Sequence, residues 1–164
     1  MQNINNLIIT KWGAYMKGYN FPCSIGRGGI GIKNHEGDGI TPSGIWEIDF
    51  VMIRPDRIKF STNYQIKIRD GWSDDPKDPS YNKLRKTNTL YSFENLWRPD
   101  PIYDLIAVTD FNRKIIKPGL GSAIFLHTWR KPRHPTEGCV AFSIQNLKWI
   151  LDNWNRKSKI IIKS

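Results

Sequence analysis

The stretch that decides the fold is Gly119-Leu120-Gly121-Ser122-Ala123-Ile124-Phe125-Leu126-His127, which is followed by Thr136-Glu137-Gly138-Cys139-Val140-Ala141. The first segment predicts an apolar strand that ends in a histidine. A short polar loop then leads to a glycine and a cysteine. This order predicts that an imidazole and a thiol open onto one cleft.

An imidazole beside a thiol is a chemically useful pair. A cysteine thiol with a pKa of ~8.5 is largely protonated at neutral pH, and a neighbouring imidazole can take its proton to give a nucleophilic thiolate. Gly138 lets the chain turn tightly beside Cys139, so that the Cys139 amide can hold the oxyanion of a reacting carbonyl. A lone cysteine can equally be an inert buried residue, and the pattern alone leaves both interpretations open.

Short β-rich segments recur on both sides of this stretch, separated by turn signals. Two turn-rich stretches, Gly26–Gly44 and Asp70–Pro79, are long enough to carry function or disorder. The predicted strands are Leu7–Trp12, Tyr19–Ile25, Ile45–Arg54, Gln65–Arg69, Asp104–Thr109, Ser122–His127 and Lys159–Lys163.

One helix is clearly marked by its cap and its periodicity. Ser143 is a good N-cap, and apolar residues follow it at helical spacing as far as Trp154, which predicts a helix to about Asn155. A weaker helix is predicted over Ser92–Leu96. The chain has 164 residues, 39% of them apolar, and no break in composition. We therefore expect residues 1–164 to form a single mainly-β domain.

The net charge of +10 is concentrated towards the C-terminus. Residues 111–164 carry eleven Lys/Arg and two acids, or +9, whereas residues 1–110 carry fourteen and thirteen, or +1. This basicity indicates an anionic partner such as nucleic acid, an acidic polymer or a membrane surface. No helix-turn-helix, finger or basic zipper pattern accompanies it, so we expect no nucleic acid partner. The apolar runs are far shorter than the ~20 residues of a transmembrane segment, and Met1–Trp12 shows no secretory signal.

Two features of the sequence are similar to cofactor-binding patterns, but neither fits its pattern fully. Gly26-Arg27-Gly28-Gly29-Ile30-Gly31 matches the dinucleotide fingerprint G-x-G-x-x-G, but no helical pattern follows to hold a pyrophosphate, which favours a Gly-rich turn. Zinc ligands are present, but their spacing fits no common zinc pattern. We expect neither a cofactor nor a metal. The candidate zinc ligands are His35, His127, His134, Cys23 and Cys139.

The order His, then Thr-x-Gly-Cys-Val, resembles the catalytic domain of the L,D-transpeptidases of the YkuD type, in a branch with a Thr-Glu-Gly-Cys nucleophile segment. Further blocks over most of the chain look like the same branch: Phe21–Gly29, Glu36–Gly44, Arg54–Arg57, Gly71–Pro76 with Tyr81-Asn82, and Gly121–His127. The resemblance implies a mixed β-sandwich with one or two peripheral helices.

The resemblance also implies roles for individual residues. Cys139 would be the acylated nucleophile, His127 the general base, and Gly138 with the Cys139 amide the oxyanion support, while Thr136 matches the Ser/Thr position of the motif. The substrate-binding candidates are Thr136, Trp129, Arg130 and Arg133. Cys23 lies outside the motif, and we expect it to be a partly buried thiol without a catalytic role.

Two residues depart from the family pattern. Glu137 stands where the commoner motif has a second histidine, and Ala141 where many members have Arg or Asn. Arg130, Lys131 and Arg133 lie between the predicted base and nucleophile and can replace the missing cation, or they can be a solvated loop.

The function implied is a cysteine-dependent L,D-transpeptidase that acts on peptidoglycan stem peptides through a thioester on Cys139. Such an enzyme would work in the bacterial periplasm or cell envelope. Alternatives are L,D-carboxypeptidase trimming of the same tetrapeptides, a non-catalytic basic module that binds the envelope, and, more weakly, a nucleic-acid-binding domain. The oligomeric state and the acyl acceptor stay open.

Overall fold

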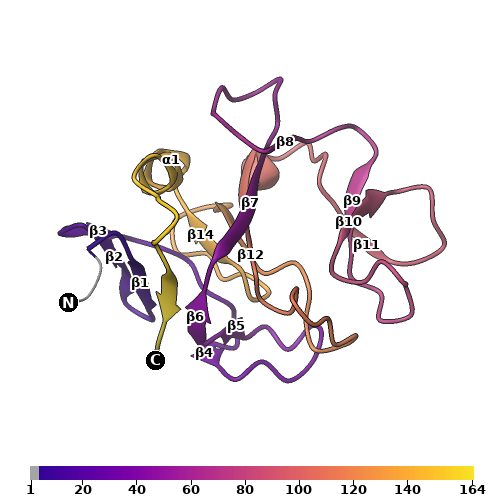
Figure 1. The fold of residues 1–164 in the computed structure, drawn as a ribbon, viewed down its shortest axis with the longest axis horizontal. Helices are drawn as coiled ribbons and strands as arrows, with labels where there is room; N and C mark the ends of the chain where they lie inside the picture. The colour runs from indigo at the N-terminus through magenta and orange to yellow at the C-terminus, as the bar shows by residue number, and fades with distance from the viewer. Residues whose placement is uncertain (1–3) are drawn as a thin grey trace.

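The computed structural model describes residues 4–164 and is mainly β (Figure 1). It has one α-helix, α1 (Ile144–Asp152), and one 3-10 helix, η1 (Pro101–Tyr103), among these residues. The strands are β1 (Leu7–Thr10), β2 (Gly13–Met16), β3 (Tyr19–Phe21), β4 (Ile30–Gly31), β5 (Thr41–Pro42), β6 (Gly44–Trp46), β7 (Ile48–Ile53), β8 (Tyr64–Gln65), β9 (Asp70–Ser73), β10 (Leu84–Lys86), β11 (Phe93–Asn95), β12 (Leu105–Thr109), β13 (Phe125–Thr128), β14 (Val140–Phe142) and β15 (Ile160–Ile162).

Two five-stranded sheets form the body of the molecule. Their strand orders are β3-β2-β1-β15-β6 and β14-β13-β12-β7-β8. Both are mixed, because β1 with β15, β13 with β14, and β7 with β8 pair in parallel. Buried side chains of both sheets and of α1 share one core, including Ile9, Leu105 and Leu147. This shared core confirms the predicted β-sandwich.

A second core lies on the other face of the β12–β13 sheet. It is built from Trp72, Tyr103, Ile106 and Phe125, and Cys139 packs against it. The small sheet β10-β9-β11 covers this core and stands apart from β1–β3 and α1 in Figure 1. Because side chains alternate along a strand, Leu126 enters the first core while its neighbour Phe125 enters the second.

The predicted elements are confirmed near His127 and Cys139, whereas several in the middle of the chain are wrong. The predicted helix at Ser143 is confirmed, with the Ser143 hydroxyl accepting a hydrogen bond from the Asn146 amide, although it ends at Asp152. The helix predicted over Ser92–Leu96 is wrong, since this segment is β11 and pairs with β9. The strand predicted over Gln65–Arg69 is only β8, and β9 lies where turns were expected. Pairing with neighbouring strands overrides these weak local preferences.

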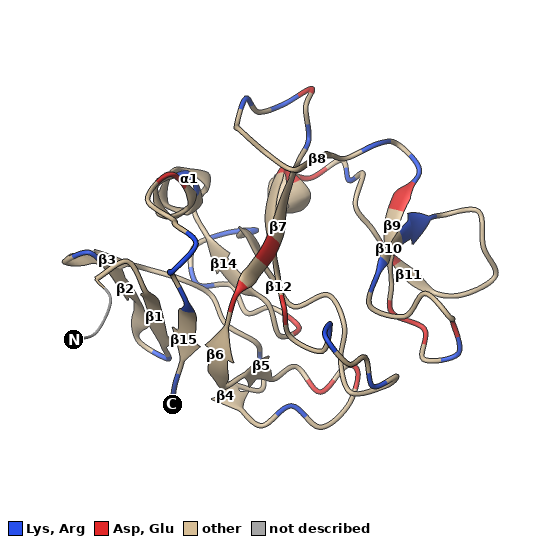
Figure 2. Cartoon of the chain, in the orientation of Figure 1, with Lys and Arg blue, Asp and Glu red and all other residues tan. Residues whose placement is uncertain are grey.

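No helix within residues 4–164 is both long enough and apolar enough to cross a membrane. The cations of the C-terminal third lie outside the helix and the strands, except for Lys148 on α1. In Figure 2, Lys and Arg occur beside β14 and on either side of β15.

Candidate active site

The predicted base and nucleophile line one cavity of about 510 Å³. His127 lies on β13, and Cys139 directly precedes β14. The two strands run parallel with His127 opposite Ala141, so the pairing itself brings the imidazole and the thiol to the same side. Thr136, Trp129 and Arg130 also line this cavity.

The Cys139 thiol is half-buried and has two backbone partners. Its Sγ donates a hydrogen bond to the carbonyl oxygen of Ala123 at 3.0 Å and accepts one from the Phe125 amide at 3.3 Å. Ala123 has a φ of 51°, a left-handed conformation that is unusual for a residue other than glycine. The buried Asn82 side chain holds this turn, because its Oδ1 accepts a hydrogen bond from the Ala123 amide at 3.0 Å.

The imidazole of His127 is buried and fixed in orientation. Its Nδ1 lies 2.8 Å from the carbonyl oxygen of Thr128. A carbonyl can only accept, so Nδ1 carries the proton and Nε2 keeps a lone pair. The ring of Tyr103 meets the imidazole edge-on at 5.4 Å between centroids. This arrangement leaves Nε2 able to accept a proton.

Both groups are neutral around pH 7. Burial raises the pKa of the Cys139 thiol to about 12, and the Glu94 carboxylate adds to this rise. Burial lowers the pKa of His127 from 6.5 to about 4, and the Arg98 guanidinium acts in the same direction, whereas the backbone carbonyls of Thr128 and Ile102 oppose this shift. The free protein therefore holds a thiol and a neutral imidazole instead of a thiolate–imidazolium pair.

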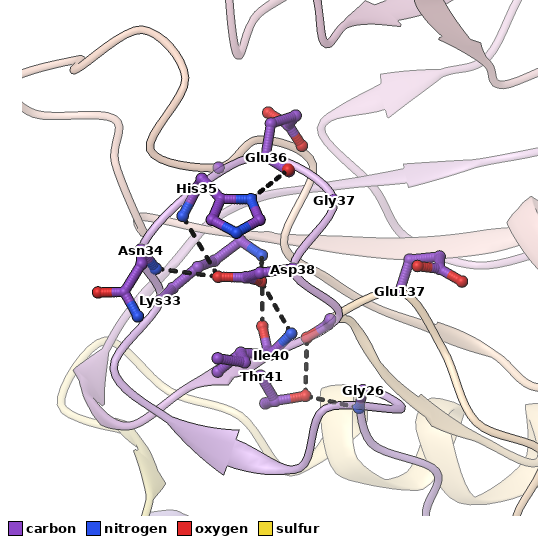
Figure 3. A network of polar contacts seen from close by, with 12 residues as sticks. Gly26, Lys33, Asn34, His35, Glu36, Gly37, Asp38, Ile40, Thr41 and Glu137 are labelled. Carbon is purple, nitrogen blue, oxygen red and sulfur yellow. Dashed lines mark hydrogen bonds and ion pairs between the residues drawn. The ribbon is translucent and has the colours of Figure 1, made fainter.

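The segment around Cys139 is tied to the glycine-rich stretch behind it (Figure 3). The Thr41 hydroxyl donates to the carbonyl oxygen of Gly138 and accepts from the Gly26 amide, both at 2.8 Å. Gly138 has a φ of +139°, and a Cβ there would lie 2.9 Å from the Ile40 carbonyl oxygen. The close approach of these two segments therefore requires glycine.

Asp38 organises the loop that carries Thr41 (Figure 3). Its carboxylate pairs with the Lys33 ammonium at 2.5 Å, and both side chains are almost fully buried. It also accepts hydrogen bonds from the backbone amides of Asn34, His35 and Ile40. Burial alone would raise the pKa of Asp38, but these hydrogen bonds hold it well below its ordinary range.

The loop that carries Cys139, residues 136–139, leaves one backbone amide free beside the thiol. Thr136 closes the loop, since its hydroxyl donates to the Cys139 carbonyl at 2.6 Å and accepts from the Gly138 amide at 3.1 Å. The Gly138 N–H is therefore engaged. The Cys139 N–H has no hydrogen-bond partner among residues 4–164, so it is the donor available to an oxyanion.

The cations of the basic loop, residues 129–135, diverge. Arg130 lines the cavity with the thiol. Lys131 lines a different pocket near α1, and Arg133 lines another beside Trp12 and Phe21. Glu137 also lines the thiol cavity, and its carboxylate pairs with Arg27 at 2.8 Å. Of the three cations named from the sequence, only Arg130 reaches the candidate site.

Sequence reasoning missed a polar cluster on the wall opposite the glycine-rich stretch. The Tyr103 hydroxyl donates to Glu94 at 3.0 Å, and Arg98 lies 3.6 Å from the same carboxylate. All three residues line the cavity. Glu94 belongs to the segment misassigned as helix, Tyr103 to η1, and Arg98 to the connection between them, so no spacing signal connected them with His127.

The glycine fingerprint is a turn, as predicted. Gly26 is so close to Gly39 that an added Cβ would lie 2.0 Å from its carbonyl oxygen, and the short strand β4 follows where a nucleotide-binding helix would begin. Within residues 4–164, no three His, Cys, Asp or Glu side chains gather as metal ligands. Cys23 is buried in the sandwich core, and both cysteines are free thiols.

Comparison with known families gives the same assignment for almost the whole chain. The model of the YkuD family, described as the L,D-transpeptidase catalytic domain, matches residues 8–162. The chain belongs to the YkuD family. Neither the curated proteins nor the solved structures gave a match. YkuD domains are L,D-transpeptidase-type catalytic domains, so membership gives this chain an enzymatic role on the peptidoglycan of the cell wall.

Proposed function

We propose that this YkuD protein is a cysteine-dependent L,D-transpeptidase that acylates Cys139 with a peptidoglycan stem peptide. The observation that carries the proposal is the single cavity that holds the Cys139 thiol, a fixed neutral imidazole and a free backbone amide. We propose further that residues 1–164 work as one catalytic domain in the periplasm or cell envelope, where the substrate lies.

Acylation begins with proton transfer. His127 Nε2 takes the thiol proton as the sulfur attacks the carbonyl of the third stem residue, and the Cys139 N–H stabilises the oxyanion. Collapse of the tetrahedral intermediate breaks the peptide bond. The departing D-amino acid takes the proton from the imidazolium, which leaves a thioester on Cys139. Because both groups are neutral in the free protein, the base acts during attack and no thiolate is stored beforehand.

The acceptor decides the product. An amine that attacks the thioester gives a new peptide bond and transpeptidation, whereas water gives L,D-carboxypeptidase trimming. We favour transpeptidation because the matching family model describes L,D-transpeptidase catalytic domains. Arg130, Trp129 and Thr136 line the thiol cavity and are the proposed substrate contacts. Arg133 lines another pocket and is not included in this set.

The test is incubation with muropeptide tetrapeptides followed by mass analysis of the products. Peptide dimers that depend on Cys139 support transpeptidation. Tripeptides alone support the carboxypeptidase alternative. Binding to sacculi with no product and no thioester would instead support the non-catalytic envelope module.

A further inference from the structure

A second pocket lies beside the thiol cavity, at the N-terminal end of α1. It has a volume of about 540 Å³, and its lining includes Thr128, Arg130, Lys131, Ile144 and Gln145. We propose that this pocket is a binding site for a small oxyanion, either phosphate or carboxylate, separate from the thiol cavity. Three features of the pocket support this.

The first feature is the helix end. Ser143 caps α1 by accepting from the Asn146 amide through its hydroxyl and from the Leu147 amide through its carbonyl. The two preceding amides, those of Ile144 and Gln145, have no acceptor among residues 4–164. Free N–H groups and the partial positive charge at a helix N-terminus together favour an anion.

The second feature is the side chain of Thr128, which is only 6% exposed. Its Oγ1 is buried and makes no hydrogen bond within residues 4–164. On β13 it alternates with His127, so it points to the α1 side of the sheet, where the pocket lies. A buried hydroxyl without a partner is costly, and an oxyanion in this pocket would accept its hydrogen bond.

The third feature is charge. Arg57, Arg130 and Lys131 line the pocket, against one carboxylate, Asp104. Asp104 already pairs with Arg57 at 3.0 Å. Arg130 and Lys131 are exposed and form no ion pair within residues 4–164, so the pocket keeps an excess of positive charge. Cations together with amide and hydroxyl donors match the geometry of a phosphate or carboxylate.

Thr128 connects this pocket with the proposed base, His127. The carbonyl oxygen of Thr128 orients the His127 imidazole, and the same residue lines the pocket. An oxyanion here can come from a carboxylate of the proposed stem-peptide substrate, reaching past Arg130, or from free phosphate. Binding itself does not depend on the proposed activity.

Titration of the full chain with inorganic phosphate and with acetate, followed by amide NMR, tests this proposal. We expect saturable shifts at Ile144 and Gln145. Thr128→Val and Lys131→Gln should each weaken binding by about fivefold to tenfold, the worth of one good hydrogen bond or charge contact. Lys163→Gln removes an equal charge from an exposed position just after strand β15 and should leave the affinity within about twofold.

Lys131 is exposed, so its variant tests the site even if Thr128→Val unfolds. Competition identifies the source of the oxyanion: a tetrapeptide that displaces phosphate, while its carboxyl-amidated form does not, points to a substrate carboxylate. Phosphate binding that the tetrapeptide leaves unchanged points to free phosphate. The proposal is overturned if neither anion binds saturably, or if Lys163→Gln weakens binding as much as Lys131→Gln.

Discussion

The two sides of the thiol cavity are built in opposite ways. The glycine-rich wall, residues 26–41, has a buried Lys33–Asp38 ion pair. It bonds to the segment that carries Cys139 through the Thr41 hydroxyl to Gly138 and the Arg27 amide to Thr136. The basic loop, residues 129–135, carries Arg130, Lys131 and Arg133, which are exposed and form no ion pair within residues 4–164. The first wall therefore holds the segment of Cys139 in place, whereas the second offers charge to ligands.

The glycine-rich wall also explains why the dinucleotide pattern Gly26–Gly31 serves close backbone packing here and not nucleotide binding. The glycines that mimic a nucleotide fingerprint allow Gly26, Gly39 and Gly138 to approach one another closely. The Gly26 and Gly28 amides bond within the stretch, to the Thr41 hydroxyl and the Gly39 carbonyl. The Thr41 hydroxyl in turn donates to the Gly138 carbonyl beside Cys139. The comparison predicts stability effects on the wall and kinetic effects on the loop.

The largest effect is expected for Asp38→Asn. It leaves the buried Lys33 ammonium without its counter-charge and should lower the free energy of unfolding by about 3–5 kcal/mol in chemical denaturation. The matched control is Glu137→Gln, which breaks the exposed pair with Arg27 and should cost no more than about 1 kcal/mol. Equal losses of unfolding free energy in the two variants would show that the buried ion pair contributes no more than the exposed one.

The same carboxylate has a pH signature. Because the pKa of Asp38 is lowered in the folded protein, its contribution is complete above the unfolded value near 4 and is lost as the pH falls towards the folded pKa. Wild-type stability should therefore drop below about pH 4 by more than that of Asp38→Asn. Parallel curves for the two proteins in this range would contradict the role of Asp38.

A smaller loss is expected for Thr41→Val. This change keeps the side-chain shape but leaves the Gly26 N–H and the Gly138 carbonyl without their shared hydroxyl, which should cost about 1–3 kcal/mol. Acylation of Cys139 should slow in the folded variant because Gly138 is no longer anchored. Thr10→Val, on strand β1 in the other five-stranded sheet, is the control. An acylation rate for Thr41→Val equal to that of this control would show that the anchor does not matter.

On the basic loop, the effects should be kinetic and unequal. Arg130→Gln should lower the acylation rate at low substrate by about twofold to fivefold at low salt, and the deficit should shrink as salt rises. Arg133→Gln should have no such effect because Arg133 lines another pocket. Rates measured at two ionic strengths distinguish them. A similar salt-dependent loss in both variants would mean that the loop acts through its total charge.

The smallest effect is expected for Cys23→Ser. Cys23 lies in the sandwich core, and burial raises the pKa of its thiol to about 11. The substitution should cost about 1 kcal/mol of stability through burial of a hydroxyl and leave turnover unchanged. A large loss of turnover at unchanged stability would give Cys23 a role that this account denies it.

The sequence predicted the parts of the site that depend on neighbours along the chain. The apolar run into His127 and the Gly-Cys turn are local signals, and both predicted the shared cavity. The contribution of Glu94, Arg98 and Tyr103 was not predictable, because β11 exists only through pairing with β9. Nor could loop position show that Arg130, Lys131 and Arg133 diverge, since this depends on the path of residues 129–135, including a left-handed turn at Arg133.

The proposed mechanism requires that Cys139 is acylated with His127 as its base. Intact-mass measurement of the protein mixed with a stem tetrapeptide, over a range of pH, tests it most directly. We predict an adduct on Cys139 in the wild type and its loss in folded His127→Ala. The rate should fall on acidification only as the pH nears the lowered His127 pKa of about 4, because the neutral imidazole is the active form. An unchanged acylation rate in His127→Ala, or an adduct on Cys23 instead, would contradict this mechanism.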